Sequence, residues 1–459
     1  MSARHGQFGF RQPSRLRGSR GTVLIVTLWV VIVLAALVVV LARSMRVEGA
    51  SSANGLAAMQ ADAIEQGAIQ YVLARVDGLE GAVPTTTDVP AEAVRVGSGA
   101  FWILNPNGDG RTHTFGIVDE ASKLNLNTAT PDVLQKLPGM TAELAAGIVD
   151  WRDGDSAVTT GGAESEYYLL LDAPYECKNA PLETVEEVLL VKGMTQTILF
   201  GEDTNRSGVL DDNENDAAAT EPADNANGQL DRGIYDFVTV YSSAPSTSAS
   251  NEALINVNEP SEALAVLLRS VVSPDRAAVA VDRARRERPF SSILDFYVKV
   301  GLTAKEFAQV ADRITTGAQP PAGLVNVNTA PSQVLAGLPG LTESDAATLI
   351  TWRSDTNNDT STVAWLAEAL PREKLTALGT VVTTRSYQFS ADIVALAGDG
   401  RAFRRCRVVV DASVSPPKVV YRQDLTSLGW PLEPAILADL RAGKSFDQVL
   451  QKPLQGIVQ

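Results

Sequence analysis

The sequence has few residues of the kinds that build metal centres and catalytic triads. It contains only two cysteines, Cys177 and Cys406, and two histidines, His5 and His113. Two cysteines are too few for a disulfide scaffold and fit no zinc pattern. A single histidine beyond the basic N-terminal segment provides no Ser-His-Asp triad. The sequence therefore gives no support for hydrolytic or zinc-dependent catalysis. It leaves open whether the two cysteines pair in an oxidising compartment or stay as buried thiols.

The chain also lacks the excess of positive charge that nucleic-acid-binding surfaces need. Its 39 lysines and arginines are outnumbered by 54 aspartates and glutamates, which gives a formal net charge of −15. A chain this acidic repels phosphate backbones unless it carries a local basic face. Hydrophobic residues make up 45% of the 459 positions, as in ordinary globular proteins. The length predicts about three domains.

One long apolar run stands near the N-terminus. Residues 22–42, TVLIVTLWVVIVLAALVVVLA, carry no charge and are preceded by five arginines. A membrane-spanning helix needs about 20 residues, so this run is long enough to cross a bilayer. The arginines predict a cytoplasmic N-terminus and place everything after Arg43 outside the cytoplasm. The run is longer than the apolar core of a secretory signal, so we expect a retained anchor. Gly21, directly before it, is typical of the cleavage site of prepilin-like proteins.

Helical and strand patterns follow the apolar run. Residues 44–76 keep helical spacing, with apolar positions at Leu56, Met59, Ile64, Ile69 and Val72. The segments GAFWILNP and THTFGIVDE flank NGDG, which predicts a β-hairpin. Alternating segments return near the C-terminus in SYQFSADIVALA, RAFRRCRVVVDASV and KVVYRQDL. Residues 94–118 and 386–421 are therefore predicted to contain strands.

An internal repeat fills much of the region between these segments. LNLNTATPDVLQKLPGM at residues 124–140 returns as VNVNTAPSQVLAGLPGL at residues 325–341, and a degraded copy begins with INVNEPSEALAVLL at residue 255. Each copy predicts a helical hairpin, which resembles the helix-hairpin-helix modules that hold DNA phosphates. The glycine-x-glycine turn of those modules is absent, and Glu143, Glu343 and Asp345 follow the turn where basic residues are needed. A packing role is therefore favoured over DNA binding.

An acidic stretch carries the pattern of a calcium-binding loop. Its spacing follows D-x-[DN]-x-[DNS]-G-x5-E, with Gly208 at the sharp turn. Calcium is wrapped by oxygen ligands at loop positions one, three, five, seven, nine and twelve. The ligands predicted here are Asp203, Asn205, Ser207, the carbonyl of Val209, Asp211 and Glu214. The alternative is a solvated acidic loop without a bound ion.

Two further acidic groups are weaker candidates for cation binding. Asp150, Asp153 and Asp155 in DWRDGD precede GGAESEYY, so Glu164 could complete a second oxygen-rich site. Asp153-Gly154 could equally turn the chain without binding an ion. The run from Asp224 to Asp231 repeats part of the calcium pattern but lacks matching first and last ligands.

Several pieces of the sequence together resemble a known family. They are the basic leader ending at Gly21, the apolar anchor, VDEASKLNLNTA, DWRDGD, GGAESEYY, KNAPLETVEEVLLVKGM and INVNE. Over most of residues 17–260 these pieces resemble the type II secretion minor pseudopilins of the general secretion pathway protein K family. The second full hairpin at residues 325–370 and the tail after Leu425 are additions to that pattern.

The resemblance implies a processing step, a position in the pseudopilus and a set of partners. Prepilin peptidase would cut after Gly21, and Thr22 would become the mature, often methylated, N-terminus. The protein would cap a short periplasmic pseudopilus, with minor pseudopilins of the I and J types and the secretion assembly platform as partners, and would bind calcium. Most pilins carry a glutamate at the fifth mature position. Here that position is Val26, and protein K similarly lacks the glutamate.

We therefore expect an α+β fold and a structural role. The expected fold has an N-terminal membrane-spanning helix that continues into a pseudopilin helix, a small antiparallel sheet, and a large inserted helical domain with repeated helix-hairpin-helix-like units. The resemblance implies that residues 94–118 and 386–421 form one sheet despite their separation, with the helical region inserted between them. The expected parts are residues 1–21 (cleaved leader), 22–42 (membrane span), 43–120 (helix and first strands), 121–200 (first hairpin), 201–233 (calcium loop), 234–320 (degenerate repeat), 321–380 (third hairpin), 381–425 (C-terminal strands) and 426–459 (tail).

The expected function is a non-enzymatic one, in the export of folded proteins across the outer membrane. The protein would sit in the inner membrane with a single span and its bulk in the periplasm. The alternative is a membrane-anchored DNA receptor of the competence type, and nucleic acid is otherwise not an expected partner.

Overall fold

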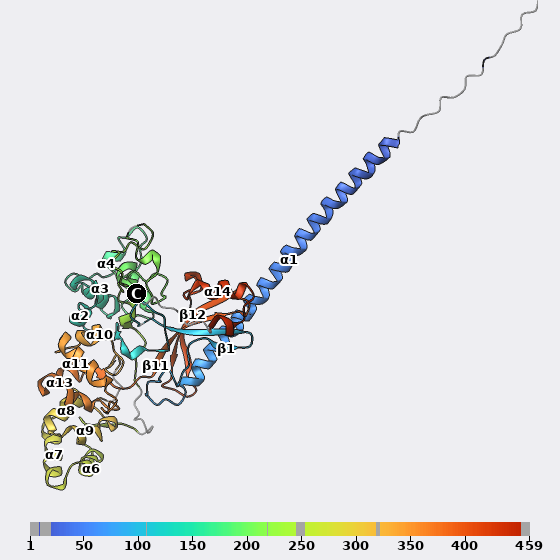
Figure 1. Cartoon of the computed structure of the whole chain (residues 1–459). Helices are drawn as coiled ribbons and strands as arrows, with labels where there is room; N and C mark the ends of the chain where they lie inside the picture. The colour runs from blue at the N-terminus through green and yellow to red at the C-terminus, as the bar shows by residue number, and fades with distance from the viewer. Residues whose placement is uncertain are drawn as a thin grey trace, which may run out of the picture. The chain divides into compact units, whose positions relative to one another are not determined.

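The computed structural model describes residue 9 and residues 20–106, 108–217, 219–244, 253–317 and 322–450. The chain divides into two compact units, Met1–Ala57 and Ala58–Gln459. Helix α1 (Arg20–Val76) begins in the first unit and ends in the second (Figure 1). Most of the expected leader and the last nine residues of the expected tail lie outside the described residues.

The first unit holds the apolar run. Among the described residues, one helix is long and apolar enough to cross a membrane by length and composition, and it starts at Thr22. Its most apolar window has a mean hydropathy of 3.3, and none of that window is buried. Such a helix near the start of the chain fits a single-pass membrane anchor. Gly21 and Thr22 lie in its first turn, while cleavage there and the orientation across the membrane stay predictions.

The second unit contains a seven-stranded sheet made from the two ends of the sequence. The strands run in the order β1-β2-β11-β12-β13, with β3 beside β2 and β4 beside β11, and every pair is antiparallel. The prediction of one sheet from residues 94–118 and 386–421 is confirmed, and so is the hairpin between β2 and β3. The strands are β1 (Val94–Val96), β2 (Gly99–Asn105), β3 (Thr114–Phe115), β4 (Val118–Asp119), β11 (Gln388–Leu396), β12 (Phe403–Asp411) and β13 (Lys418–Asp424).

Helices cover both faces of this sheet. The end of α1 packs Ile64, Ala68 and Val72 against one face, which also buries Phe101 of β2. The tail helices α14 (Pro434–Arg441) and α15 (Phe446–Leu450) cover the other face. Two covered faces explain why every residue of β11 is buried. The sequence prediction placed Leu56 and Met59 on the same apolar side as Ile64, but these two side chains are 65% and 63% exposed, so that part of the prediction is wrong.

The remaining elements form the helical insert between β4 and β11, with one large core of its own. Its first part has η1 (Glu120–Ser122), β5 (Leu124–Asn125), α2 (Pro131–Leu134), α3 (Ala142–Arg152), α4 (Ser165–Tyr168), η2 (Val185–Leu190), α5 (Gln196–Phe200), η3 (Asp212–Glu214), η4 (Tyr235–Phe237) and β6 (Val238–Thr239). Its second part has β7 (Ile255–Asn256), α6 (Glu262–Val271), α7 (Pro274–Arg286), α8 (Ile293–Val300), α9 (Ala304–Ala308), η5 (Ala311–Arg313) and β8 (Ile314–Thr315). Its third part has β9 (Val325–Asn326), α10 (Ser332–Gly337), α11 (Glu343–Ser354), η6 (Val363–Trp365), α12 (Leu366–Ala369), α13 (Arg372–Leu378) and β10 (Val382–Thr383).

Each part of the insert is closed by a two-stranded parallel pair: β5 with β6, β7 with β8, and β9 with β10. The first strand of each pair ends in an asparagine whose side-chain oxygen accepts the N–H two residues further on. These asparagines are Asn125, Asn256 and Asn326, and each forms a local turn through its own side chain. The description of the three parts as helix-hairpin-helix-like units stays a prediction.

Two expectations from the sequence need correction. Residues 381–425 were expected to supply strands to the sheet alone, but β10 lies in this range and pairs with β9 of the insert. A two-residue strand is too short for alternation to reveal which partner it takes. Of the two possibilities for Cys177 and Cys406, the structure has two free buried thiols, because one lies in the core of the insert and the other in the core of the sheet.

Candidate functional site: two acidic loops

The loop of residues 203–214 folds around the carboxylate of Asp203. This side chain is buried, and its two oxygens accept hydrogen bonds from the N–H groups of Ser207 at 2.8 Å and Gly208 at 2.9 Å. Gly208 has a φ of 76°, a left-handed conformation that glycine adopts without steric cost. The loop thus makes the sharp turn that the calcium pattern requires, with its first predicted ligand on the inside.

Four other predicted ligands contact one another in pairs. The amide of Asn205 donates to Asp211 at 2.5 Å, and the hydroxyl of Ser207 donates to the carbonyl oxygen of Val209 at 2.9 Å. A hard cation such as calcium takes about six to eight oxygen ligands, so a bound ion would replace these hydrogen bonds by direct bonds to the oxygens.

Glu214, the last predicted ligand, has an oxygen that the described residues leave without a hydrogen bond. The side chain is 1% exposed, its Oε2 atom accepts the N–H of Asp211 at 3.1 Å, and its Oε1 atom is buried without a partner in the described part of the chain. Burial, with the nearby carboxylates of Asp203 and Asp211, raises the pKa of Glu214 to about 8. A buried carboxylate oxygen without a donor is costly unless a proton or cation meets it. The residues of this loop therefore fit calcium.

The second acidic group is more tightly gathered than the first. Over the described ranges, one set of three acidic side chains places ligand oxygens within 4.8 Å of one another, and it consists of Asp153, Asp155 and Glu164. Glu164 is 2% exposed, and neither of its oxygens has a hydrogen-bond partner among the residues that the structure describes. The Oδ1 atom of Asp153 is also buried without a hydrogen-bond partner among the described residues. Burial is the main cause that raises the pKa values of both carboxyls.

Asp150 has a different role beside this group. It is completely buried, and both of its oxygens accept the N–H of Thr159 at 3.2 Å. A Cβ atom at Gly162 would collide with the Asp150 carboxylate, so the glycine pair in GGAESE lets the loop pass close to this side chain. Asp150 therefore stabilises the loop from Thr159 to Gly162 through its hydrogen bonds and close packing. The side chains whose oxygens converge are Asp153, Asp155 and Glu164.

Asp224 and Asp231 do not join a cluster of converging carboxylates in the described residues. The oxygens of Asp224 accept the N–H groups of Asp216, Ala217 and Ala226, and those of Asp231 accept the side-chain amide of Asn225. These bonds describe a local turn on an exposed surface, where the oxygens already have donors.

The sequence analysis missed a buried arginine that holds the first acidic loop. The side chain of Arg405 on β12 is fully buried and donates to the carbonyl oxygens of Asn205, at 2.6 Å, and Arg206. It also forms an ion pair with Asp392 of β11 at 2.9 Å. Arg405 and Arg407 stand two apart in RRCRVVV, so they share one face of a strand. Two arginines on one face of an otherwise apolar strand indicate that carboxylates or carbonyl oxygens lie opposite them, because a buried guanidinium needs hydrogen-bond acceptors.

The helix that a DNA phosphate would approach already has an anion at its N-terminus. At the start of α11 the carboxylate of Asp345 accepts the N–H of Thr342 at 2.8 Å and pairs with Lys374 at 2.6 Å. The hydrogen bond from Lys374 is the largest cause that lowers the pKa of Asp345 to about 2. A carboxylate that stays charged in this place repels phosphate.

One segment of the chain is similar to a known family. Residues 123–200, which include α2, α3 and the second acidic group, match the family model described as Type II secretion system (T2SS), protein K. Over these residues the chain is similar to the protein K family of type II secretion. Members of this family are minor pseudopilins, and the DNA-receptor alternative is not supported.

One solved structure is also similar to this chain. It is a chain in the crystal structure of the GspK–GspI–GspJ complex from the type 2 secretion system of enterotoxigenic Escherichia coli. The match has 11% sequence identity and a TM-score of 0.41, and it covers 83% of this chain and 98% of that chain. No curated protein matches the chain in sequence.

Proposed function

We propose that this chain is a minor pseudopilin of the protein K type, which caps the periplasmic pseudopilus of a type II secretion system and acts there as a structural subunit without enzymatic activity. Prepilin peptidase would remove the leader after Gly21, and the apolar helix would stay in the inner membrane with the bulk of the chain in the periplasm. The partners would be minor pseudopilins of the I and J types and the assembly platform.

The observation that carries the proposal is the place of the insert in the sheet. β4 and β11 are hydrogen-bonded neighbours, with Asp119 opposite Phe389, although the whole helical insert lies between them in sequence. The sheet therefore closes as if the insert were absent, while the insert forms its own core. A bulky addition to a fibre subunit is tolerated at the end of the fibre, where no further subunit has to stack.

Val26 supports the same position. The glutamate that most pilins carry at the fifth mature position neutralises the N-terminal amine of a neighbouring subunit in the membrane. A carboxylate inside the bilayer is costly unless it has a partner. In a subunit that makes no such pair, valine at this position inserts into the membrane at a lower free-energy cost than glutamate.

Calcium is part of the proposal. Asp203, Asn205, Ser207, Val209, Asp211 and Glu214 would hold one ion, and Asp153, Asp155 and Glu164 would contribute to a second. The unpartnered buried oxygens of Glu214 and Glu164 support both sites. The ions would supply positive charge that offsets carboxylate repulsion, and the protein residues would keep the loops folded.

A deletion strain tests the function. Cells that lack this chain should no longer export folded substrates or should assemble pseudopili of altered length, and the wild-type chain should restore both. Val26→Glu should restore export less well than the matched control Val26→Ile. Normal export and normal pseudopilus length in the deletion strain would overturn the proposal.

The processing step is tested separately. Mass spectrometry of the chain from cells should find Thr22 at the N-terminus.

A further inference from the structure

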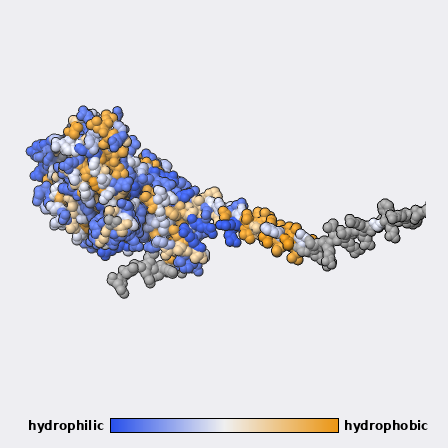
Figure 2. Space-filling model, turned by 90° about the horizontal axis from the view of Figure 1, so that it is seen from above, coloured by the Kyte–Doolittle hydropathy of each residue, from blue (hydrophilic) through white to orange (hydrophobic). Residues whose placement is uncertain are grey.

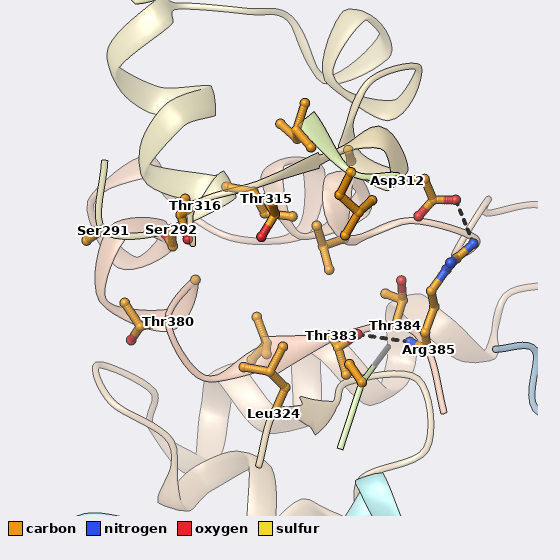
Figure 3. Close-up of a pocket in the computed structure, with 18 of the residues that line it drawn as sticks. Ser291, Ser292, Asp312, Thr315, Thr316, Leu324, Thr380, Thr383, Thr384 and Arg385 are labelled. Carbon is orange, nitrogen blue, oxygen red and sulfur yellow. Dashed lines mark hydrogen bonds and ion pairs between the residues drawn. The ribbon is translucent and has the colours of Figure 1, made fainter. Parts of the chain in front are cut away.

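A cavity separates the second and third parts of the helical insert. Its volume is about 210 Å³, and it is lined by β8 and the start of α8 on one side and by β10 with the residues that follow it on the other (Figure 3). This volume is below the ~300–1,000 Å³ of pockets for drug-sized molecules. The cavity is therefore suited to a short piece of a larger molecule.

The cavity is bordered by strand edges. Ile314, Thr315 and Thr316 are consecutive in sequence and all line it, as do Val382, Thr383, Thr384 and Arg385. Successive side chains of a strand point to opposite faces, so a surface that touches several consecutive residues lies along the edge of the strand. Figure 3 shows Thr315 and Thr316 on one side of the cavity and Thr383 and Thr384 on the other.

These edges carry backbone groups that the parallel pairs do not use. The carbonyl oxygen of Thr383 accepts the N–H of Val327 at 3.0 Å, and the carbonyl oxygen of Thr315 accepts the N–H of Val257 at 2.8 Å. The backbone groups of Thr383 and Thr315 therefore point to the paired edges, toward β9 and β7. Along a strand, backbone groups alternate in direction, and the N–H and C=O groups of Ile314 and Val382 therefore point to the opposite edges. Among the described strands, none pairs with these two edges, and an unpaired edge is a template for another strand.

The side chains of the cavity favour an uncharged occupant. Hydroxyl groups from Ser291, Thr315, Thr380 and Thr383 lie among apolar side chains such as Leu324. The two charged side chains in the lining, Asp312 and Arg385, form an ion pair at 3.2 Å and neutralise each other. The lining thus complements a neutral chain, although the protein as a whole has a net charge of −15.

The chain itself already uses strand pairing beside this cavity. Ser243 and Ala322 form an antiparallel bridge, and the N–H of Gly323 donates to the carbonyl oxygen of Ser242 at 3.2 Å. Ala244, which follows, lines the cavity. We propose that the cavity binds a short, extended, uncharged segment of another polypeptide, which adds as a strand to the open edge of β10 with β8 as the opposite wall. This proposal does not rest on the proposed function.

Peptide selection on the full-length protein in detergent micelles tests the proposal. A random heptapeptide library displayed on phage is selected against the wild type, and the best sequence is synthesised with a twin that is N-methylated at alternate amides. Leu324→Trp fills the cavity, and Leu170→Trp is the matched control because Leu170 is 87% exposed and does not line it. Val382→Pro removes an N–H at the open edge but leaves the bond from Val327 to Thr383.

The expected result is binding of the selected peptide to the wild type and to Leu170→Trp with the same Kd. Leu324→Trp, Val382→Pro and N-methylation of the peptide should each weaken binding at least about tenfold, which corresponds to about 1.4 kcal/mol. Melting temperatures near that of the wild type show that the variants fold. The proposal is overturned if no selected peptide is weakened by Leu324→Trp. It is also overturned if the N-methylated twin binds as tightly, because strand addition needs the peptide N–H groups.

Discussion

Arg405 of β12 forms a two-pronged ion pair with Asp392 of β11, with N···O distances of 3.1 Å and 2.9 Å, and both side chains are buried. The same guanidinium donates to two carbonyl oxygens of the first acidic loop. One side chain therefore joins the sheet to a loop about 200 residues earlier in the sequence, and the loop cannot leave the sheet without exposing an arginine and an aspartate together.

Replacement of Arg405 should destabilise the protein strongly. Arg405→Met leaves Asp392 buried without its cation, a change that typically costs about 3–5 kcal/mol. Denaturant unfolding of the full-length protein in detergent measures this cost. The double variant Arg405→Met with Asp392→Leu should recover part of it, because no buried charge remains. Equal stability of wild type and Arg405→Met would contradict the role given to this residue.

Calcium should raise the melting temperature through the first acidic loop. An ion that binds only the folded state stabilises it by about 2.7 kcal/mol at a concentration one hundred times its Kd. Glu214→Gln should reduce the shift between calcium and chelator, whereas Asp224→Asn, in an exposed turn, should leave it unchanged. Glu164→Gln tests the second acidic group in the same assay. The absence of any shift in the wild-type protein would remove calcium from the proposal.

Without a cation, stability should fall as the pH rises from about 5 to about 8. Burial raises the pKa of Glu214 from its ordinary value of 4.5 to about 8. The folded protein therefore keeps a proton over a range in which the unfolded chain has lost it, and folding is favoured by low pH in that range. The contribution is complete below pH 4.5 and is lost as the pH passes about 8.

The measurement is the melting temperature in chelator across this pH range. Glu214→Gln cannot take up the proton, so its melting temperature should depend less on pH than that of the wild type. Saturating calcium should also flatten the wild-type curve, because the cation competes with the proton. Identical pH profiles for wild type and Glu214→Gln would show that Glu214 titrates normally.

The tail should contribute to the stability of the sheet. Phe446 of α15 is 2% exposed and packs with its ring centroid 6.3 Å from that of Trp102 on β2. Phe446→Ala should cost about 3–5 kcal/mol. Leu450→Ala on the same helix is the matched control, since Leu450 is 37% exposed and should lose less. Thermal unfolding compares the two variants, and similar losses would mean that the tail is not part of the folded core.

The long strands of the sheet could be predicted because they alternate clearly, whereas their joining in one sheet was implied by the family resemblance. Residues 94–118 and 386–421 gave a strand pattern whose shared sheet is confirmed, although which strand lies beside which could not be read from alternation. The two-residue strands β5 to β10 were out of reach, since a period of two needs a longer run. Sequence spacing ranked the loop at Asp203 above the group at Glu164, yet the latter gathers its carboxylates more closely, because convergence depends on contacts across the fold rather than on spacing.

The tail shows the same limit. The spacing of its apolar residues did not reveal that Ile436, Leu440 and Phe446 face Trp102 of a strand more than 300 residues earlier. The hydrogen bond from Arg405 to Asn205 likewise joins residues that are 200 positions apart in sequence. Contacts of this kind are set by topology, and local patterns carry only a hint of them.

Because β4 and β11 are neighbours, the two ends of the insert leave the sheet side by side. Both covalent connections of the insert therefore lie at one place on the sheet, while Arg405 fastens the first acidic loop to the sheet at a second place. A change in length among the helices of the insert would thus leave the pairing of β4 with β11 intact, whereas a change in the loop held by Arg405 would disturb the sheet.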